Sequence, residues 1–342
     1  MALHHYSQAK VGTAVIECGI GGEYDSTNIL MRPSVTGITS LGIDHTAILG
    51  ENIESIAWHK AGVFKPGVPA FTTSQPAPAM KVLHARAEER DTTLQVAPTY
   101  TALDDIKLGL YGDFQRLNAS LAVAIASSHL QRLGYSNLPD PLDTHAAMPV
   151  EFVKGLENTR LGGRCEKRAD QVSSDLTWYI DGGHTLESIK LAGEWFASEV
   201  LSSQDAMRIL IFNQQTRDAS ALARGLFDTL AAALENGQPF QHVIFCTNTT
   251  YQRRGYKADL VSINVDNTDV ESLKVQHELA RTWDTSDAAA NVHIFATIEE
   301  AIAKARDLTG HQRVSVLATG SLHLVGGVIE VLETEIEHKD RQ

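Results

Sequence analysis

Short apolar runs alternate with longer stretches of helical periodicity from Val11 onward. This alternation is typical of α/β folds, in which strands and helices follow one another along the chain. The first ten residues indicate the end of a helix that leads into a strand, and the prolines at 136–144 indicate a loop followed by a short helix. The predicted strands are 11–17, 34–43 and 68–73, and the predicted helices are 51–63, 76–90 and 113–133.

A second alternation begins near residue 165. Its strands are continuous apolar runs, which are typical of parallel strands buried on both faces. Helical segments separate them, for example 186–201 and 220–234, and a polar stretch at 249–269 indicates an insertion or a long loop. We therefore predict two α/β domains, at residues 1–155 and 156–342. The predicted strands of the second domain are 177–181, 208–213, 242–247, 291–296 and 313–319.

Polar residues follow four of the strands predicted in the second domain. In open α/β sheets, ligands bind beyond the carboxyl ends of the parallel strands. One polar strand end is common in any such fold, whereas several at one edge suggest a working face. The four polar segments are 181–184, 213–215, 247–248 and 319–321.

The composition narrows the function classes. Apolar residues make up 43% and charged residues 21% of the 342-residue chain, which is typical of a soluble globular protein. The formal net charge of −13 argues against non-specific binding to duplex DNA or to anionic lipid. The three cysteines lie far apart, so neither a disulfide framework nor a zinc site is expected. We expect the protein to occupy a reducing compartment. No apolar run approaches the length of a membrane span, and the first ten residues contain no hydrophobic signal core.

The segment GIGGEYDSTN, residues 19–28, has the glycines of a phosphate-binding loop. A nucleotide P-loop also requires a lysine that reaches the terminal phosphate, and a dinucleotide loop requires a third spaced glycine. The segment has neither, so we interpret it as a glycine turn. Glu17 precedes this turn at the end of the first predicted strand, where a carboxylate can hold Mg²⁺ or cap a backbone amide.

The segment 41–67 contains two further candidates. His45 follows the second predicted strand at the same sheet edge as Glu17, but Mg²⁺ prefers oxygen ligands, so a hydrogen-bonded loop histidine is the alternative. Lys60 shares a helical face with apolar residues such as Ile56. Burial disfavours the charged form of a lysine, and a neutral amine can attack a substrate or capture CO₂ as a carbamate. The alternative is that its ammonium group reaches the solvent.

Four segments together closely resemble the folylpolyglutamate synthases, a family of the Mur-ligase superfamily, in their eukaryotic, fungal form. The segments are IECGIGGEYDSTN (16–28), LGIDHTAILGENIESIAWHKAGVFK (41–65), WYIDGGHTLES (178–188) and VLATGSLHLVGGVIEVLE (316–333). They occur in family order and extend over essentially the whole chain. The resemblance implies a Mur-ligase-like central nucleotide-binding α/β domain at 1–155, shortened at its N-terminus, followed by a Rossmann-like glutamate-ligase domain at 156–342.

The resemblance implies a ligase reaction. Members of the family add L-glutamate to the γ-carboxylate of tetrahydrofolate or its polyglutamates, with ATP and Mg²⁺ and with K⁺ as a further cation. The carboxylate is first phosphorylated to an acyl phosphate, which the amine of glutamate then attacks. This chemistry needs charge neutralisation and accurate positioning more than a protein nucleophile. The family further implies a monomer in the cytosol or mitochondrion (matrix or inner-membrane associated), without nucleic-acid or integral-membrane partners.

The resemblance also implies roles for five residues of the first domain. Glu17 and His45 match the ligands of two Mg²⁺ ions. Lys60 matches a lysine that is carbamylated in several members, where it helps to organise the second metal, and it is a candidate catalytic residue. Gln115 and Asn118 match a helix that faces the nucleotide. A helix-surface position is the alternative for Asn118, and Gln115 also has a purely structural alternative.

Five residues of the second domain receive roles in the same way. Arg164 matches an arginine that reaches the ATP phosphates, and Asp181 matches an acid at or near the ATP ribose. His184 and Ser321 match positions near the incoming glutamate, and His184 is the other candidate catalytic residue. His323 occupies a position that is tyrosine in some bacterial members. Capping of the following helices is the alternative for Asp181 and Ser321, and pairing with a surface acid is the alternative for Arg164.

The chain departs from the family pattern before Glu17. Family members carry a P-loop of the form G-T-N-G-K-G-S well before the E-x-G-I-G-G segment, whereas sixteen residues precede Glu17 here. We therefore expect the P-loop, the folate loop and the first strand of the central sheet to be absent, which puts the activity of this chain in question. The favoured interpretation is an incomplete version of an active enzyme. The alternatives are a dihydrofolate synthase and an inactive folate- or nucleotide-binding paralogue.

Overall fold

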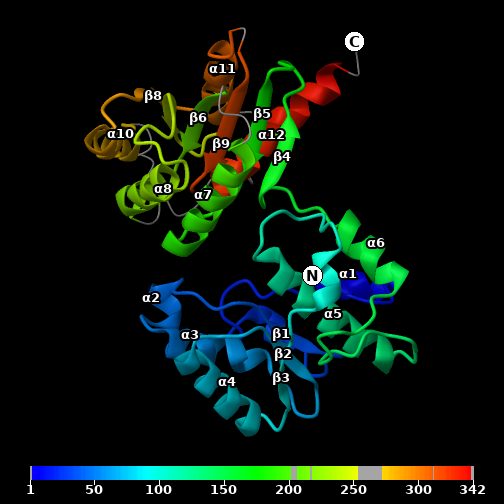
Figure 1. Ribbon diagram of the computed structural model, residues 1–342. Helices are drawn as coiled ribbons and strands as arrows, with labels where there is room; N and C mark the ends of the chain where they lie inside the picture. Colours follow the sequence, from blue (N-terminus) through cyan, green and yellow to red (C-terminus); the bar gives the residue numbers. More distant parts are fainter. Residues whose placement is uncertain (1, 202–205, 216–217, 253–271, 311, 340–342) are drawn as a thin grey trace. The chain divides into compact units, whose positions relative to one another are not determined.

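The computed structural model describes residues 2–201, 206–215, 218–252, 272–310 and 312–339 (Figure 1). The chain divides into two compact units. The first unit comprises residues 1–108 and 113–158, and the second comprises residues 109–112 and 159–342. Each unit has its own sheet with helices on both faces, so the predicted α/β class is confirmed.

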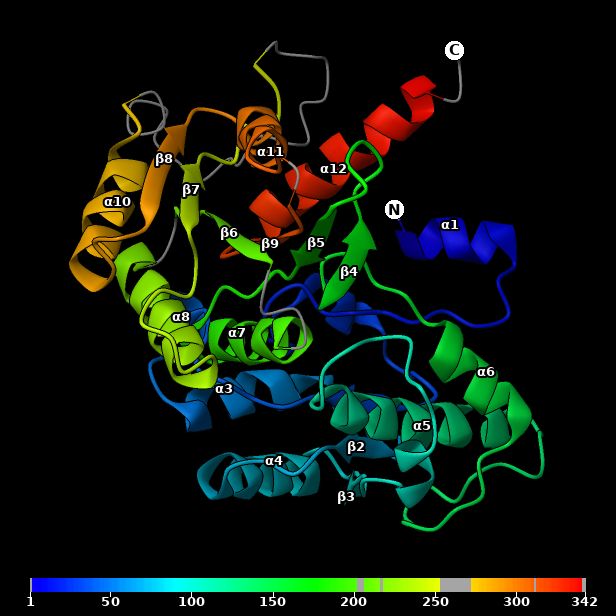
Figure 2. The ribbon, with the colours of Figure 1, turned by 45° about the horizontal axis from the view of Figure 1, so that its top comes forward.

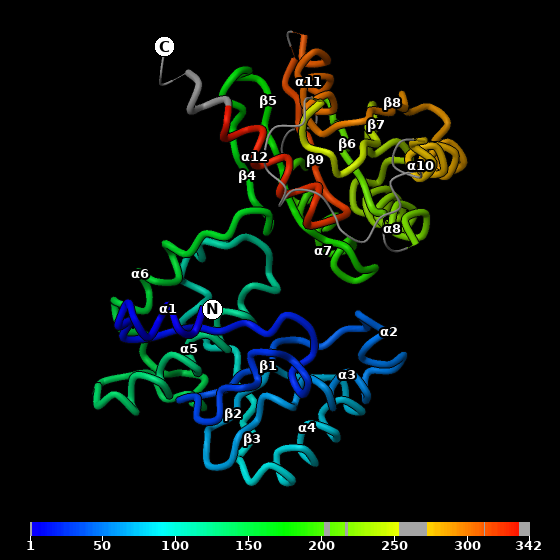
Figure 3. Tube along the Cα trace, turned by 180° about the vertical axis from the view of Figure 1, so that it is seen from behind, coloured from blue at the N-terminus to red at the C-terminus, as the bar shows by residue number. Residues whose placement is uncertain are grey.

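The first unit is built on a small parallel sheet with the strand order β1-β2-β3. Phe64 and Leu83 belong to a core cluster on one face, with α3 and α4, while Phe71 and Leu121 belong to a cluster on the other, with α5 (Figure 3). Two of the predicted strands are thus confirmed in shorter form, all three predicted helices are confirmed, and β3 is an addition. These elements are β1 (Thr36–Ile38), β2 (Ala70–Thr72), β3 (Leu94–Val96), α3 (Ile53–Lys60), α4 (Ala77–Glu89) and α5 (Gln115–Arg132).

Shorter helices complete the first unit. The helix expected within the first ten residues is present, and so are the loop at 136–144 and the short helix after it. Asn52 begins α3 by accepting a hydrogen bond from the backbone of Ser55, as a helix N-cap does. The remaining helices are α1 (Ala2–Ala9), α2 (Thr46–Leu49) and α6 (Val150–Asn158), with 3₁₀ turns at Ser26–Ile29, Ala61–Val63 and Thr101–Asp104.

The strand predicted at 11–17 is wrong. These residues have no regular secondary structure, and Val15 is 92% exposed. A β-strand depends on hydrogen bonds to a neighbouring strand, and none of the strands that the structure describes pairs with this segment. The apolar pattern indicated a segment suited to burial, but pairing partners, not pattern, determine whether a strand forms. Glu17 therefore does not end a strand.

The second unit contains a larger sheet with the strand order β4-β5-β9-β6-β7-β8. The five strands predicted here are confirmed, and these five run parallel to one another. The sixth, β4, pairs antiparallel with β5 at the edge; its charged sequence, EKRA, lacks the apolar signal of a buried strand. The strands are β4 (Glu166–Ala169), β5 (Leu176–Ile180), β6 (Met207–Phe212), β7 (His242–Cys246), β8 (Asn291–Phe295) and β9 (Val314–Thr319).

Helices cover both faces of this sheet (Figure 2). Leu324 and Ile298 belong to a core cluster that α11 and α12 form with one face. On the other face, the rings of Phe196, Phe240 and Trp283 form a chain of aromatic contacts that joins α7 to α10. The helices are α7 (Leu186–Val200), α8 (Ala219–Ala233), α10 (Lys274–Ser286), α11 (Ile298–Asp307) and α12 (Leu322–Lys339).

Two further features concern the polar segment at 249–269 and membrane-spanning helices. The polar insertion predicted at 249–269 lies for the most part outside the described residues, which resume at 272. Within the described part of the chain, no helix is both long enough and apolar enough to cross a membrane.

Candidate functional site

The glycine turn at 19–28 is closed by a carboxylate of its own chain. Asp25 accepts hydrogen bonds from the backbone N–H groups of Gly19 (2.9 Å), Ile20 (3.0 Å) and Thr27 (2.9 Å). The Thr27 hydroxyl also donates to Asp25, and this bond, with the backbone N–H groups and against the effect of burial, lowers the pKa of the Asp25 carboxyl. Because Asp25 occupies these N–H groups, the segment is a turn and not a phosphate cradle.

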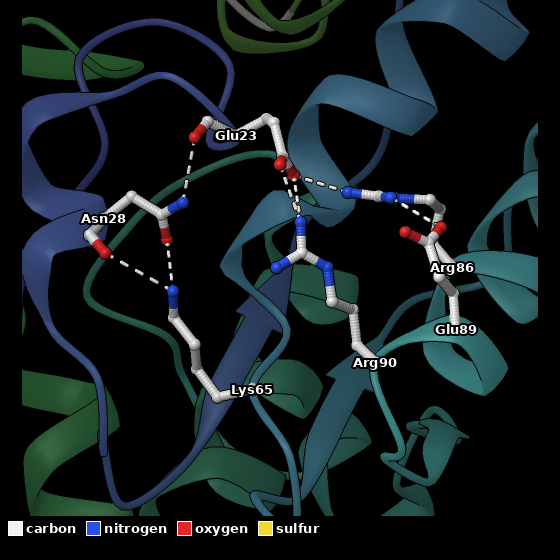
Figure 4. Close-up of polar contacts among 6 residues, drawn as sticks. All are labelled: Glu23, Asn28, Lys65, Arg86, Glu89 and Arg90. Atoms are coloured by element: carbon white, nitrogen blue, oxygen red, sulfur yellow. Dashed lines mark hydrogen bonds and ion pairs between the residues drawn. The ribbon is translucent and has the colours of Figure 1, made fainter.

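Glu23 ties this turn to α4 (Figure 4). Its backbone N–H donates to the carbonyl of His59 at 2.8 Å. Its carboxylate accepts from Arg90 Nη2 at 2.6 and 2.7 Å and from the guanidinium of Arg86. The Arg86 side chain is only 4% exposed, and its guanidinium carbon lies 4.4 Å from the centre of a ring of Trp58. Two arginines therefore fix the turn by one acidic side chain.

A buried lysine supports the other end of the turn. Lys65 is 7% exposed, and its Nζ donates to Oδ1 of Asn28 at 2.7 Å (Figure 4). Asn28 in turn donates through Nδ2 to the backbone carbonyl of Glu23 at 2.9 Å. Burial, and then the positive charge of Arg90, lower the pKa of Lys65. The sequence analysis did not identify this cluster; the i, i+4 spacing of Arg86 on α4 and Arg90 at its C-cap was the available signal.

A cavity of about 500 Å³ borders the glycine turn. Residues of the turn line one side, with Leu49 of α2 and His59 of α3 also in the lining. Tyr24, which is 81% exposed, stands edge-on to the ring of His59, with 5.7 Å between ring centroids. A cavity of this volume, with Tyr24 and His59 in its lining, is large enough for part of an organic ligand.

Glu17 and His45 are single candidate metal ligands and do not belong to a complete metal site among the described residues. Glu17 is exposed, and His45 adopts the left-handed conformation (φ 51°), with Nε2 3.7 Å from an oxygen of Asp44. No group of three His, Cys, Asp or Glu side chains that could hold a metal occurs among the described residues. Mg²⁺ is usually held by one or two carboxylates together with substrate phosphates and water. A site that holds Mg²⁺ with Glu17 and His45 would therefore need oxygens from substrate or water as well.

Lys60 is the last residue of α3 and is half-buried. Ile56 and Ala57 of the same helix are completely buried, so Lys60 lies beside the apolar face, as its spacing predicted, without sharing its full burial. The more deeply buried lysine of this region is Lys65, five positions later. Lys60 is therefore neither fully buried nor fully exposed.

Gln115 and Asn118 lie together at the start of α5. Gln115 is 6% exposed, and its Oε1 accepts a hydrogen bond from Nδ2 of Asn118 at 2.9 Å. The side chains are one helical turn apart, which places them on the same face. Their pairing leaves the amide nitrogen of Gln115 and the carbonyl oxygen of Asn118 to meet other partners, a combination that suits a heterocyclic base.

Asp181 follows β5 and is held in a backbone cradle. It is 6% exposed, and it accepts hydrogen bonds from the backbone N–H groups of Cys165 and Gly183, each at 2.8 Å. Burial raises the pKa of Asp181, although these amides and the charge of Arg164 act in the opposite direction. The guanidinium of Arg164 lies so close to Gly182 that a Cβ there would stand 2.6 Å from its Nη1. The structure thus brings together Arg164 and Asp181, as the predicted nucleotide site requires.

His184 stands at the start of α7. Its Nδ1 is 2.9 Å from the carbonyl oxygen of Gly182, and a carbonyl can only accept, so Nδ1 carries a proton. In the neutral imidazole, Nε2 then holds the lone pair. The backbone N–H of His184 donates to the hydroxyl of Ser188, which belongs with Thr185 to the capping box of α7. The start of the helix therefore sets both the position and the tautomer of this histidine.

Ser321 and His323 lie at the start of α12 and differ in their surroundings. Ser321 is 6% exposed and accepts a hydrogen bond from the N–H of Leu324 at 3.0 Å, so it caps the helix. Its hydroxyl also stands 3.3 Å from Oδ1 of Asn248. His323 is exposed. The capping alternative for Ser321 is thus real, and the contact with Asn248 is additional to it.

Buried amides join the strand ends of the second unit. Asn213, after β6, is completely buried and donates to Oδ1 of Asn248, after β7, at 2.8 Å. Gln276 of α10 is also completely buried and donates to Oδ1 of Asn213 at 2.9 Å. Because β5, β9, β6 and β7 are consecutive in the sheet, the predicted working face is one continuous edge. Gln276 was missed, since nothing in a polar position on a helix indicates that it is buried.

Comparisons with known proteins place this fold in a class. The structure is similar to a folylpolyglutamate synthase of Mycobacterium tuberculosis complexed with ADP, with a TM-score of 0.67 and 23% identity, over 97% of this chain and 70% of the other. It is also similar to an AMPPCP complex of a folylpolyglutamate synthase, with a TM-score of 0.61 and 21% identity. The chain therefore has the α/β fold of these solved structures.

Sequence similarity points to particular relatives. The chain is 45% identical to the folylpolyglutamate synthase of Neurospora crassa, over 97% of its own length and 63% of that protein. It is 43% identical to folylpolyglutamate synthases of Saccharomyces cerevisiae strains, over 97% of its length and 60% of theirs. No family model matches the sequence. The chain spans about 60% of the length of the curated relatives it matches.

Proposed function

We propose that this chain carries the glutamate-adding machinery of a folylpolyglutamate synthase, which joins L-glutamate to the γ-carboxylate of tetrahydrofolate or its polyglutamates at the expense of ATP. The observation that carries the proposal is the 45% identity to the Neurospora crassa enzyme over 97% of this chain. The polar strand-end face of the second unit supports it, because a ligase that positions two charged substrates needs convergent polar groups. The cytosol or the mitochondrion and a monomeric state are part of the same proposal.

The incoming amino acid is proposed to bind at the strand ends beside His184 and Ser321. The N-termini of α7 and α12 lie here, and the positive end of a helix favours carboxylates. Nε2 of His184 holds a lone pair because Nδ1–H is engaged with Gly182. We assign His184 the role of accepting a proton from the glutamate ammonium, which must lose one before its nitrogen can attack an acyl phosphate. Exposed His323 is proposed to border the same site.

The nucleotide and its metal are proposed to use the other matched residues. Arg164 would neutralise phosphate charge, and Mg²⁺, when bound, would withdraw electron density from the phosphates. K⁺ is a further proposed cation. Lys60 would contribute a carbamate beside the metal. The proposed nucleotide-site residues are Gln115, Asn118, Arg164 and Asp181, and the proposed metal ligands are Glu17 and His45.

The experiment is ATP-dependent incorporation of radiolabelled L-glutamate. The purified 342-residue chain is assayed with tetrahydrofolate and, separately, with dihydropteroate as acceptor. Because the relatives are longer, a chimera in which this chain replaces the matched part of the Neurospora crassa enzyme is assayed in parallel. We expect the chimera to label tetrahydrofolate. His184→Gln in the chimera should lower kcat at least tenfold, since general acid–base catalysis typically contributes that much or more.

The controls separate the competing functions. Labelling of dihydropteroate in place of tetrahydrofolate would assign the chain to the first glutamylation step. A chimera that folds, binds ATP and labels neither acceptor would contradict the proposal and favour a binding protein. Lys81→Ala, at an exposed position of α4, is the matched variant that should leave incorporation unchanged.

A further inference from the structure

The amide network of the second unit has a direction, and a buried backbone group sets it. Nε2 of Gln276 lies 3.1 Å from the carbonyl oxygen of Cys246 and 2.9 Å from Oδ1 of Asn213. A backbone carbonyl can only accept a hydrogen bond, so the atom of Gln276 that faces it must be the nitrogen. Gln276 is completely buried and has no room to reverse this choice by turning to water.

The orientation of Gln276 determines that of the next amide. Because Gln276 donates, the atom of Asn213 that it meets must be the oxygen, and Nδ2 of Asn213 must point the other way. That nitrogen lies 2.8 Å from Asn248, so it must face Oδ1 of Asn248. Oδ1 of Asn248 accepts from the Ser321 hydroxyl as well, at 3.3 Å. The contact with Nδ2 of Asn213 requires an acceptor at this position and so fixes the orientation of the amide, and the Ser321 hydroxyl can donate to the same oxygen.

The network therefore ends in an outward-facing donor. With its oxygen engaged, Asn248 directs Nδ2 away from the buried amides, toward Oε1 of Gln215 at 3.3 Å. An amide nitrogen carries two hydrogens, and this long contact occupies one of them. Asn248 is half-buried, in contrast with the complete burial of Asn213 and Gln276. Through Gln276 and Asn213, the buried carbonyl of Cys246 thus determines that Asn248 presents an N–H donor at the strand-end face.

We propose that Nδ2 of Asn248 binds a carboxylate of the incoming amino acid, and that Gln276, acting through Asn213, is the positioning residue that keeps this nitrogen outward. The proposal deepens the proposed function and rests on it for the identity of the amino acid. A carboxylate fits because it only accepts hydrogen bonds, and because the N-terminus of α12, capped by Ser321, favours negative charge at the same place. An ammonium group has no lone pair to accept a hydrogen bond from Nδ2 of Asn248.

The test uses equilibrium dialysis with radiolabelled L-glutamate, which needs no turnover, on the chain and on the chimera. Asn248→Asp is the decisive variant, because its inner oxygen still accepts from Asn213 and Ser321 while its outer atom becomes an acceptor with negative charge. We expect its Kd for L-glutamate to rise about a hundredfold, and that of Asn248→Ala about tenfold, as for loss of a hydrogen bond to a charged group. The Kd for ATP should be unchanged.

Two further variants separate positioning from structural damage. Gln276→Met keeps the volume and removes the donor; its Kd for L-glutamate should rise, with the Kd for ATP retained. Gln252→Ala is the matched control: Gln252 is exposed, its side-chain amide donates to Glu300 and its backbone N–H to Glu299, and the variant should bind like the parent. In Asn248→Asp, L-glutamine or isoglutamine should bind relatively better than L-glutamate, and the better of the two identifies which carboxylate Asn248 contacts.

The outcomes distinguish the two levels of the proposal. Unchanged L-glutamate affinity in folded Asn248→Asp, while the parent binds, would overturn the role of Asn248 and leave the proposed function standing. A parent chimera that binds ATP but no L-glutamate would overturn the proposed function and the inference together. Loss of ATP and L-glutamate affinity in equal measure in Gln276→Met would show a merely structural role for that residue.

Discussion

Two polar clusters of this protein solve different problems with different chemistry. Around Glu23, the first unit uses full charges: two arginines converge on one carboxylate, and a buried lysine holds the neighbouring asparagine. At the strand ends of the second unit, neutral amides form the buried connections. Charges attract strongly but lack an inherent direction, whereas an amide has a donor end and an acceptor end.

The difference indicates what each cluster can contribute. The charged cluster joins Glu23 of the glycine turn to α4. It therefore fixes the wall of a cavity and chiefly stabilises the fold of the first unit. The amide cluster sets the orientation of the Asn248 side chain, starting from a buried carbonyl. It therefore chiefly serves ligand binding. Disruption of the first should therefore affect unfolding more than binding, and disruption of the second should do the reverse.

The largest expected effect follows from breaking the charged cluster at Arg86. Arg86→Met leaves the Glu23 carboxylate, which is 16% exposed, with one arginine fewer. Removal of one partner from a buried ion pair destabilises by about 3 kcal/mol. We expect a loss of that order in the free energy of unfolding of the first unit, measured by urea denaturation followed by fluorescence of Trp58.

An exposed pair provides the matched control. The side chains of Arg116 and Asp104 are 37% and 70% exposed. Because solvent screens such pairs, Arg116→Met should change the free energy of unfolding by less than about 1 kcal/mol. Equal losses in the two variants would contradict the distinction between a buried anchor and a surface contact.

A smaller loss is expected from the amide cluster. Gln276→Met leaves the carbonyl of Cys246 and Oδ1 of Asn213 without their shared donor. A buried polar group without a partner costs about 1–3 kcal/mol, partly offset here by the better burial of methionine. We expect a loss of about 1 kcal/mol on urea denaturation. A loss as large as that in Arg86→Met would show that the amides are chiefly structural.

A pair of histidines offers a neutral cluster that acid can charge. His242 of β7 and His293 of β8 stack with ring nitrogens 3.0 Å apart. Burial, followed by the positive charge of Lys304, lowers the pKa of His242; burial, with His242 and Lys304, lowers that of His293. Folding therefore favours the neutral rings: their contribution to stability is present above the unfolded pKa of about 6.5 and is lost as the pH falls through the lower folded values.

The measurement is the urea midpoint of the second unit between pH 7.5 and pH 5. The midpoint should fall over this range, and it should fall less in the double variant His242→Gln/His293→Gln, which has no ring to protonate at this place. The change should be smaller than that of either preceding variant at constant pH, since both rings are partly exposed. A midpoint that falls equally in both proteins would assign the pH dependence to other groups.

The sequence predicted most of the strands and helices in the two alternations because long, regular apolar patterns are a largely local signal. It predicted the strand-end face for the same reason, since parallel strands bring their carboxyl ends to one edge. The roles of Arg86, Lys65 and Gln276 could not be predicted, because burial of a polar side chain depends on partners far away in the sequence. β4 was missed because an edge strand needs hydrogen bonds more than apolar side chains.

Residues 11–17 provide the smallest expected effect and the last test of the comparison. The predicted strand does not form, and Val15 is 92% exposed. A side chain that stays in contact with water in both the unfolded and the folded state contributes no hydrophobic stabilisation. Val15→Ser should therefore change the free energy of unfolding of this chain by less than about 0.5 kcal/mol. The same substitution in the chimera measures whether the additional length of the relatives covers this segment. A loss of more than about 1 kcal/mol in the chimera, with none in the 342-residue chain, would mean that residues 11–17 are buried in the chimera. The apolar pattern would then indicate a strand whose pairing partner lies outside the described residues.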